Sequence, residues 1–347
     1  IRKHRRMGSI DDSQNDRLGI SKRSRTDVKS YDVFMLPKNK RKKYSADMAS
    51  DSKPSKPYVL SDELRQEHNL TDNDDIPASI AVLEEKAKQN DPDALFVLGV
   101  LFDDENNTEH VQRDQRKAIE AYEKAAELGD TRAMFNLATI YDFGYKDQND
   151  HNIERAIYFY QKAADAGEVC AQTNLGVLYE TGCGVEKNLE KAAELYTSAS
   201  QKGDIEATYN LATLYENGNG VPKDLAKCCE LLEIAANAGD NDAKVKLAYM
   251  LENGLIPNQT ADPVRAIQLY QEAAEAGNSD AQFNLATMYE TGKGVERDES
   301  KVVEWYEKSA ENGNKEAQFN LAVIYQTGQF EGVDVNNAKA FEYYKRS

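Results

Sequence analysis

The sequence lacks a long apolar run, a cysteine framework and any clear cluster of catalytic side chains. Its longest apolar stretch, Ala94 to Phe102, has nine residues, whereas a helix that crosses a membrane needs about 20. No membrane span is therefore expected. The four cysteines show no recurring paired spacing, and Cys228 and Cys229 are adjacent. We therefore expect no disulfide framework, and a reducing compartment is favoured.

Groups that bind metals or perform catalysis are also scarce. The sequence contains four histidines and no Cys/His spacing typical of a metal site. No Ser/His/Asp or paired-acid arrangement stands out from the rest of the sequence. Gly-x-Gly segments such as Gly182-Cys-Gly184 follow no predicted strand, so they indicate turns and not a nucleotide-binding loop. The sequence predicts a protein that is not an enzyme, with no cofactor, no metal and no small-molecule substrate.

Charge is abundant but unevenly distributed. Residues 1–57 hold 16 Lys and Arg against 7 Asp, a net charge of +9, whereas residues 58–347 hold 27 basic and 53 acidic residues, a net charge of −26. Such an excess of carboxylates repels a phosphate backbone, so residues 58–347 are not expected to bind nucleic acid. Residues 1–57 have three aromatics and no sustained apolar period. They are predicted to form a disordered basic arm, followed by a linker over 58–79.

The basic arm contains a dense cationic run over residues 38–43. Its charged members are Lys38, Lys40, Arg41, Lys42 and Lys43. Such a run is typical of nuclear import signals; contact with nucleic acid or anionic lipid, or simple solubilising charge, are the alternatives. We expect a cytoplasmic or nuclear protein. Three glycosylation sequons, at Asn69, Asn106 and Asn258, allow a luminal location, which the basic arm and the unpaired cysteines disfavour.

An internal repeat dominates the sequence from residue 80 onward. Its clearest mark is an alanine that recurs every 36 to 39 residues. The seven units begin at Ala94, Ala133, Ala171, Ala207, Ala243, Ala281 and Ala317. A leucine stands four residues beyond each alanine, and an aromatic residue, or once a leucine, stands eight beyond. This spacing places these residues on one face of a helix.

Each unit contains a second periodic segment, with small residues and usually a tyrosine, and glycines follow most of the periodic segments. Glycine is the usual residue where a helix ends in a left-handed conformation, so each unit is predicted to be two helices. One helix pair buries too little surface alone, so the units must stack. The sequence therefore predicts an all-α solenoid over 80–347. Because it begins at Ile1 and stops within the last unit, we expect a truncated or processed segment.

The repeated strings identify a resemblance. AQTNLGVLYETGCGVEKNLEKAAELYTSASQKGD, at residues 171–204, and AQFNLATMYETGKGVERDESKVVEWYEKSAENGN, at residues 281–314, resemble Sel-one-like repeats, which are relatives of tetratricopeptide repeats. The resemblance covers residues 94–347, with a half-unit from Ile80. It implies a right-handed α/α superhelix whose first helices line a concave, partner-binding face, without catalysis. The loops of the first, second and fifth units depart from the family pattern.

Two positions on the first helix are candidates for partner binding. The asparagines at the third residue after the alanine are Asn136, Asn174, Asn210, Asn284 and Asn320. The aromatic residues beside them are Phe135, Tyr209, Phe283 and Phe319, with Phe96 in the first unit. A row of asparagine amides can hold the backbone of an extended peptide. The alternative is that the asparagines bond to the neighbouring repeat and the aromatic residues pack between units.

An acidic position recurs near the end of the first helix. Its members are Asp103, Asp142, Glu180, Glu216, Glu252 and Glu290. A carboxylate there is slightly unfavourable to the helix dipole, so its recurrence suggests another role. The two interpretations are a solvated position and a stripe that binds a basic peptide.

Together these observations predict a scaffold or adaptor that binds a protein or peptide, with a basic segment as one option. Similarity to known repeat proteins leaves two other roles open. One is a regulatory subunit that activates a partner enzyme, as in the chitin synthase activators. The other is a luminal adaptor of membrane-protein quality control. Bacterial members suggested to be hydrolases usually have a cysteine pair in each unit, which this chain lacks.

Overall fold

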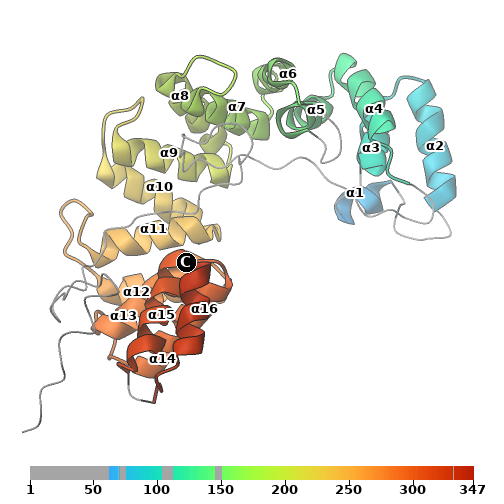
Figure 1. The fold of residues 1–347 in the computed structure, drawn as a ribbon. Helices are drawn as coiled ribbons and strands as arrows, with labels where there is room; N and C mark the ends of the chain where they lie inside the picture. Colours follow the sequence, from blue (N-terminus) through green and yellow to red (C-terminus); the bar gives the residue numbers. More distant parts are fainter. Residues whose placement is uncertain (1–61, 69, 71–75, 104–111, 145–150, 331) are drawn as a thin grey trace, which may run out of the picture. The chain divides into compact units, whose positions relative to one another are not determined.

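The structure is a computed structural model that describes residues 62–68, 70, 76–103, 112–144, 151–330 and 332–347. The chain divides into two units, residues 1–35 and 36–347, and every described residue belongs to the second. The described residues form sixteen α-helices and no strand (Figure 1). The predicted basic arm, including the cationic run over 38–43, lies outside the described residues.

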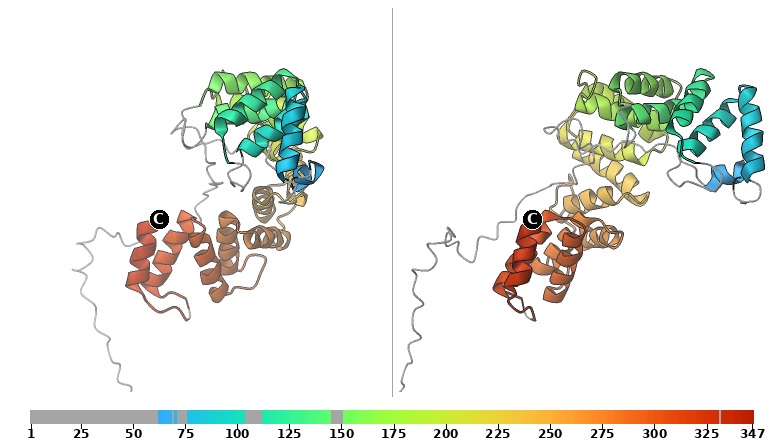
Figure 2. Two further views of the ribbon diagram at one scale, coloured as in Figure 1. Left: turned by 90° about the vertical axis from the view of Figure 1, so that its right-hand side faces the viewer. Right: turned by 45° about the vertical axis from the view of Figure 1, so that its right-hand side comes forward.

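The helices form seven consecutive pairs, preceded by α1 (Asp62–Glu67) and α2 (Ile76–Lys88). The first helices of the pairs are α3 (Pro92–Asp103), α5 (Thr131–Phe143), α7 (Val169–Thr181), α9 (Ile205–Asn217), α11 (Asn241–Glu252), α13 (Ser279–Thr291) and α15 (Lys315–Thr327). The second helices are α4 (Gln115–Glu127), α6 (Ile153–Asp165), α8 (Leu189–Gln201), α10 (Leu225–Asn237), α12 (Pro263–Glu275), α14 (Glu299–Glu311) and α16 (Asn337–Arg346). Figure 2 shows each pair beside the next in two further views. The predicted all-α solenoid of seven units is confirmed.

The helix ends follow from the local sequence. At the start of α9, the Asp204 carboxylate accepts a hydrogen bond from the backbone N–H of Ala207, which satisfies an otherwise unpaired donor. The helix ends at Gly218, whose φ of 74° suits glycine because it has no side chain to clash with the backbone. The recurring alanine therefore marks the first turn of each first helix, and a glycine marks the end of α5, α7, α9, α13 and α15.

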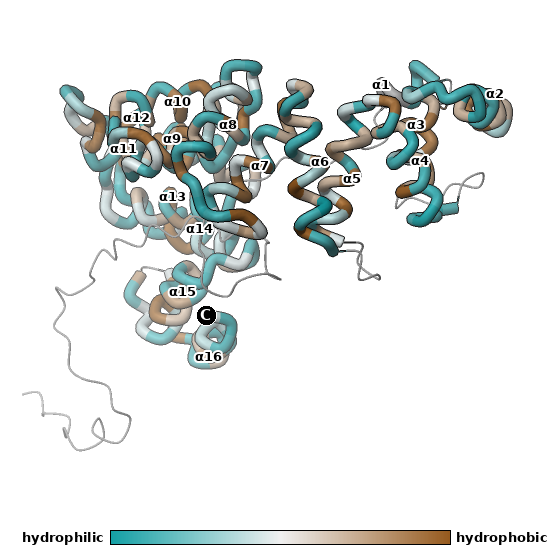
Figure 3. Tube along the Cα trace, turned by 90° about the horizontal axis from the view of Figure 1, so that it is seen from above, coloured by the Kyte–Doolittle hydropathy of each residue, from teal (hydrophilic) through white to brown (hydrophobic). Residues whose placement is uncertain are grey.

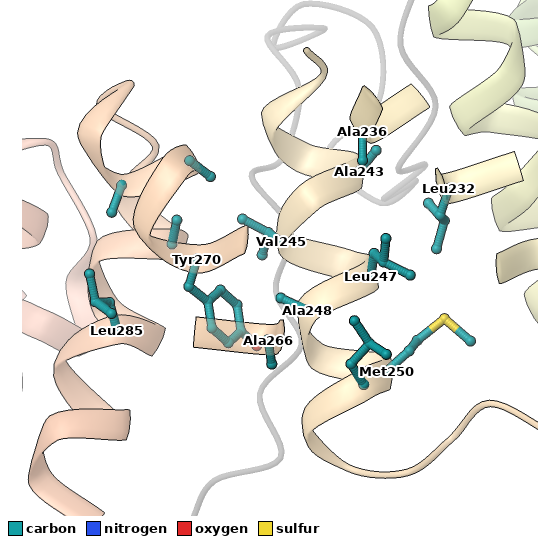
Figure 4. Close-up of a cluster of buried hydrophobic side chains, with 14 of the residues drawn as sticks. Leu232, Ala236, Ala243, Val245, Leu247, Ala248, Met250, Ala266, Tyr270 and Leu285 are labelled. Atoms are coloured by element: carbon teal, nitrogen blue, oxygen red, sulfur yellow. The ribbon is translucent and has the colours of Figure 1, made fainter. Parts of the chain in front are cut away.

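Neighbouring pairs pack through small and aromatic side chains. Along helices such as α5 and α6, hydrophobic and hydrophilic residues alternate (Figure 3), as expected where one face is buried. The tyrosine of the second helix is the largest buried side chain at most of the contacts between pairs. Figure 4 shows the ring of Tyr270, which is fully buried, between Ala248 and Leu285. These three residues come from α12, α11 and α13, so one tyrosine joins two units.

The loop that connects the two helices of a unit also contacts the preceding unit. A Cβ atom at Gly220, in the loop after α9, would collide with the backbone oxygen of Leu189 at the start of α8. Only glycine allows this approach. The Gly-x-Gly segments are thus turns, as predicted, and they add to the contact between units.

The ordered body begins earlier than predicted. Helix α2 starts at Ile76, inside the predicted linker, and Leu70 is buried against the first units. Pro77 is compatible with this start because a proline in the first turn of a helix leaves no N–H unpaired. In the described part of the chain, no helix is both long and apolar enough to cross a membrane.

Candidate functional site

The predicted asparagines of the second, third and fourth units lie inside the protein. Asn136 and Asn174 are 1% and 0% exposed, and Asn210 is also fully buried. The Asn136 side chain donates a hydrogen bond to the hydroxyl of Tyr122, and Asn174 donates to that of Tyr160, both at 3.1 Å. In each case the tyrosine belongs to the second helix of the preceding unit. Asn136 and Asn174 therefore join one unit to the next.

The acidic position completes this contact. The Tyr160 hydroxyl donates to Asp142 at 3.4 Å, and the Tyr196 hydroxyl donates to Glu180 at 2.8 Å. The same bond recurs in the fifth and sixth units. Its members are Tyr270 to Glu252 at 3.3 Å and Tyr306 to Glu290 at 2.9 Å. We call the acid, the tyrosine and the asparagine of the following unit the junction relay.

Burial keeps the tyrosines of the junction relay in their donor form. Burial, followed by the nearby charge of Asp103, raises the pKa of Tyr122 well above its ordinary value. Burial and the carboxylate of Glu252 likewise raise the pKa of Tyr270. A protonated hydroxyl can donate to the acid while it accepts from the asparagine, and bonds to a charged acceptor are stronger than neutral ones. The relay is therefore well suited to hold adjacent units in one orientation.

These findings correct the predicted roles of several residues. Asn136, Asn174, Asn210, Phe135 and Tyr209 are at most 1% exposed, so they cannot contact a partner in this structure. The alternative role, packing between repeats, is the one observed at these positions. The acidic position is neither simply solvated nor an open stripe, because its carboxylate accepts a bond from a tyrosine in the second, third, fifth and sixth units. No single position in the sequence indicated that the acid accepts a hydrogen bond from a tyrosine. The tyrosine and the asparagine of the next unit are 14 residues apart in each pair, whereas the acid stands 16 or 18 residues before the tyrosine. The recurrence of all three in successive units was therefore the signal that links them.

The same positions are more accessible in the last two units. Phe283 and Asn284 on α13 are half-buried, as is Asn320 on α15, whereas Phe319 is 51% exposed. Asn320 hydrogen-bonds to Tyr306. The Asn284 side chain has no hydrogen-bonding partner among the described residues. The structure thus brings four of the nine predicted partner-binding residues to accessible positions on α13 and α15 (Figure 1).

The described residues give little support for catalytic or metal chemistry. They contain no group of three His, Cys, Asp or Glu residues able to hold a metal ion. Burial raises the pKa of the Cys228 and Cys229 thiols to about 12 and about 11, so both are protonated and weakly nucleophilic at neutral pH. An open depression before α11 is lined by Asp240, Asp242 and Asn278. Enclosed apolar pockets are more typical of small-molecule sites.

The segments of the chain that match a known repeat family correspond to the helix pairs. The model of the Sel1 repeat matches seven successive segments of the chain. They are residues 92–130, 131–168, 171–204, 205–240, 241–278, 279–314 and 315–347. Each segment spans one pair, from α3 and α4 to α15 and α16, although α7 begins two residues before its segment. A search of curated proteins gave no match.

Two solved structures are similar over most of the chain. The first is c5321, a protective antigen present in uropathogenic Escherichia coli strains with an SLR fold. It is 31% identical with a TM-score of 0.68, and the match covers 82% of this chain and 59% of c5321. The second is a Sel1 repeat protein from Oxalobacter formigenes. It is 31% identical with a TM-score of 0.61, and the match covers 67% of this chain and 91% of the other.

Proposed function

The chain belongs to the Sel1 repeat family, and we propose that it is a non-enzymatic scaffold that binds a segment of a partner protein on α13 and α15. Proteins of this family are generally scaffolds for protein interactions. The observation that supports this location is a contrast between equivalent positions. Asn174 is fully buried and bonded to Tyr160, whereas Asn284 is accessible and unpaired among the described residues.

The chemistry of the accessible residues suits an extended peptide. The amide of Asn284 offers two donors and one acceptor to a peptide backbone. Phe283 and Phe319 offer apolar surface to its side chains. The net charge of −26 over residues 58–347 favours a partner segment that contains Lys or Arg, because opposite charges raise the rate of encounter.

Paired asparagine variants test this proposal. Peptides are first selected for binding to the full chain from a random displayed library, and their affinities are then measured by calorimetry. Asn284→Ala is expected to weaken binding by about 0.5 to 1.5 kcal/mol, the usual contribution of one hydrogen bond, and to leave the melting temperature unchanged.

The matched control is Asn174→Ala, which removes the same side chain from a buried position. It is expected to lower the melting temperature because the Tyr160 hydroxyl loses its donor. If the selected peptides bind equally well to Asn284→Ala, Phe283→Ala and Phe319→Ala variants, the proposed location is wrong.

A further inference from the structure

The junction between the fourth and fifth units departs from the junction relay. Leu232 on α10 stands at the position of the relay tyrosine, and Lys246 on α11 stands at the position of the relay asparagine. Leu232 is the one residue other than tyrosine at its position in the seven units, and Lys246 is the one residue other than asparagine at its position in units two to seven. Glu216 on α9 keeps the acidic position. The two changes therefore face each other across a single junction.

The lysine replaces the tyrosine as the donor to the acid. Its Nζ atom lies 2.6 Å from a carboxylate oxygen of Glu216 and donates a hydrogen bond to the Thr213 hydroxyl at 3.2 Å. The same atom lies 5.6 Å from the centre of the Tyr209 ring. Lys246 is only 2% exposed, and Leu232 is fully buried in the same core cluster as Leu247. A buried ammonium group therefore has a carboxylate, a hydroxyl and an aromatic ring as neighbours.

Each single mismatch at this junction is expected to destabilise it, for a different reason in each case. An asparagine opposite Leu232 would have no tyrosine hydroxyl to bond, and Glu216 would lose its cation. A tyrosine opposite Lys246 would add bulk at position 232, which is fully buried, and overpacking a filled core is destabilising. Buried groups that lose a partner cost more than the bond itself contributes. Leu232 and Lys246 are thus compatible with each other. Neither is compatible with the relay residue at the opposite position, which is asparagine for Leu232 and tyrosine for Lys246.

We propose that Leu232 and Lys246 are coupled replacements for the relay tyrosine and asparagine, and that together they make the fifth unit specific for the fourth. The pair of replacements favours a unit with leucine over a unit with the relay tyrosine at the position that faces Lys246. It does so both by the bonds that Lys246 forms and by the destabilising contact that a tyrosine would make there. Repeats of similar sequence can pair in the wrong order during folding. A buried ammonium at this junction, where the other junctions have tyrosine and asparagine, therefore favours pairing of the fifth unit with the fourth over pairing with a unit that ends in the relay tyrosine.

A cycle of variants in the full chain tests the coupling. Leu232→Tyr and Lys246→Asn are made separately and together, and the urea midpoint is measured from the circular dichroism of the helices. Each single change is expected to lower the midpoint by about 0.5 to 1 M. The double variant is expected to recover at least half of the summed loss of the two single variants, because the introduced tyrosine and asparagine would rebuild the relay with Glu216.

The converse cycle is made at the junction between the third and fourth units. Tyr196→Leu and Asn210→Lys are combined there, where Glu180 supplies the acid. The proposal is supported if each double variant unfolds at a higher midpoint than the value expected from adding its two single losses, or folds where one of its single variants does not. It is overturned if either double variant fails to fold, or if it unfolds at or below that additive midpoint.

Discussion

Carboxylates at buried or half-buried positions differ in whether both of their oxygens accept a hydrogen bond. The relay acids Glu180 and Glu290 each accept a tyrosine hydroxyl. Asp280, in the first turn of α13, accepts one bond from the Asn314 side chain at 2.8 Å, whereas its second oxygen is buried without a hydrogen-bonding partner among the described residues. Burial, followed by the charges of Asp242 and Glu316, raises the pKa of Asp280 to about 6. The bond from Asn314 acts in the opposite direction.

The Asp280 carboxylate is expected to reduce stability at neutral pH. Because its pKa is higher in the folded chain, the stabilising protonated form is fully present below about pH 4 and is lost as the pH rises through about 6. Asp280→Asn should therefore raise the free energy of unfolding at about pH 7.5 by about 1 to 2 kcal/mol, with a much smaller gain at about pH 4.5. Thermal melts of both proteins at the two pH values measure this. An equal gain at both pH values would contradict the titration of Asp280.

At the scale of single helices, the sequence predicted most of the architecture. The spacing of Ala207, Leu211 and Tyr215 and the glycine at 218 define α9 because helix periodicity and helix ends depend on local chemistry. The role of Asn174 was harder to predict because it depends on a tyrosine in another unit. Whether the Asn284 side chain is paired or accessible depends on how closely its helix packs against the preceding unit, which supplies the relay tyrosine, and no local sequence pattern reports this packing.

The contact between two helices of one unit limits side-chain size. Gly176 on α7 faces the buried ring of Tyr196 on α8, and a Cβ atom there would lie 2.6 Å from a ring carbon. Gly176→Ala is therefore expected to lower the melting temperature, although alanine favours helix by about 1 kcal/mol over glycine. The double variant Gly176→Ala/Tyr196→Phe serves as the control for the hydroxyl. A melting temperature that rises in Gly176→Ala would show that the ring moves aside at little cost.

At the scale of the whole molecule, two oppositely charged segments share one chain, with +9 over residues 1–57 and −26 over residues 58–347. Exposed charges more than about 8 Å apart are largely screened at physiological salt. The acidic segment is thus expected to hold the basic arm only weakly, which leaves the run over 38–43 available to a receptor. The nuclear import role of this run stays a prediction because it lies outside the described residues.

A reporter fusion tests the import prediction. Residues 1–57 attached to a large inert cytoplasmic protein should concentrate it in the nucleus, because import receptors bind extended cationic peptides. Replacement of Lys40, Arg41, Lys42 and Lys43 by alanine should abolish this, whereas replacement of Lys53 and Lys56 should not. Fluorescence microscopy gives the nuclear fraction. A reporter that stays cytoplasmic in all forms would leave the arm with a solubilising role.

The junction relay also has a consequence for how the gene can gain or lose repeats. Because acid and tyrosine lie in one unit and the asparagine in the next, removal of residues 171–206 would set Tyr160 against Asn210 and preserve a relay contact. Removal of residues 207–242 would instead set Tyr196 against Lys246. Two in-frame deletions of equal length are therefore expected to differ in their yield of folded protein. Whether the protein tolerates the loss of a repeat therefore depends on which side chains face each other at the new junction.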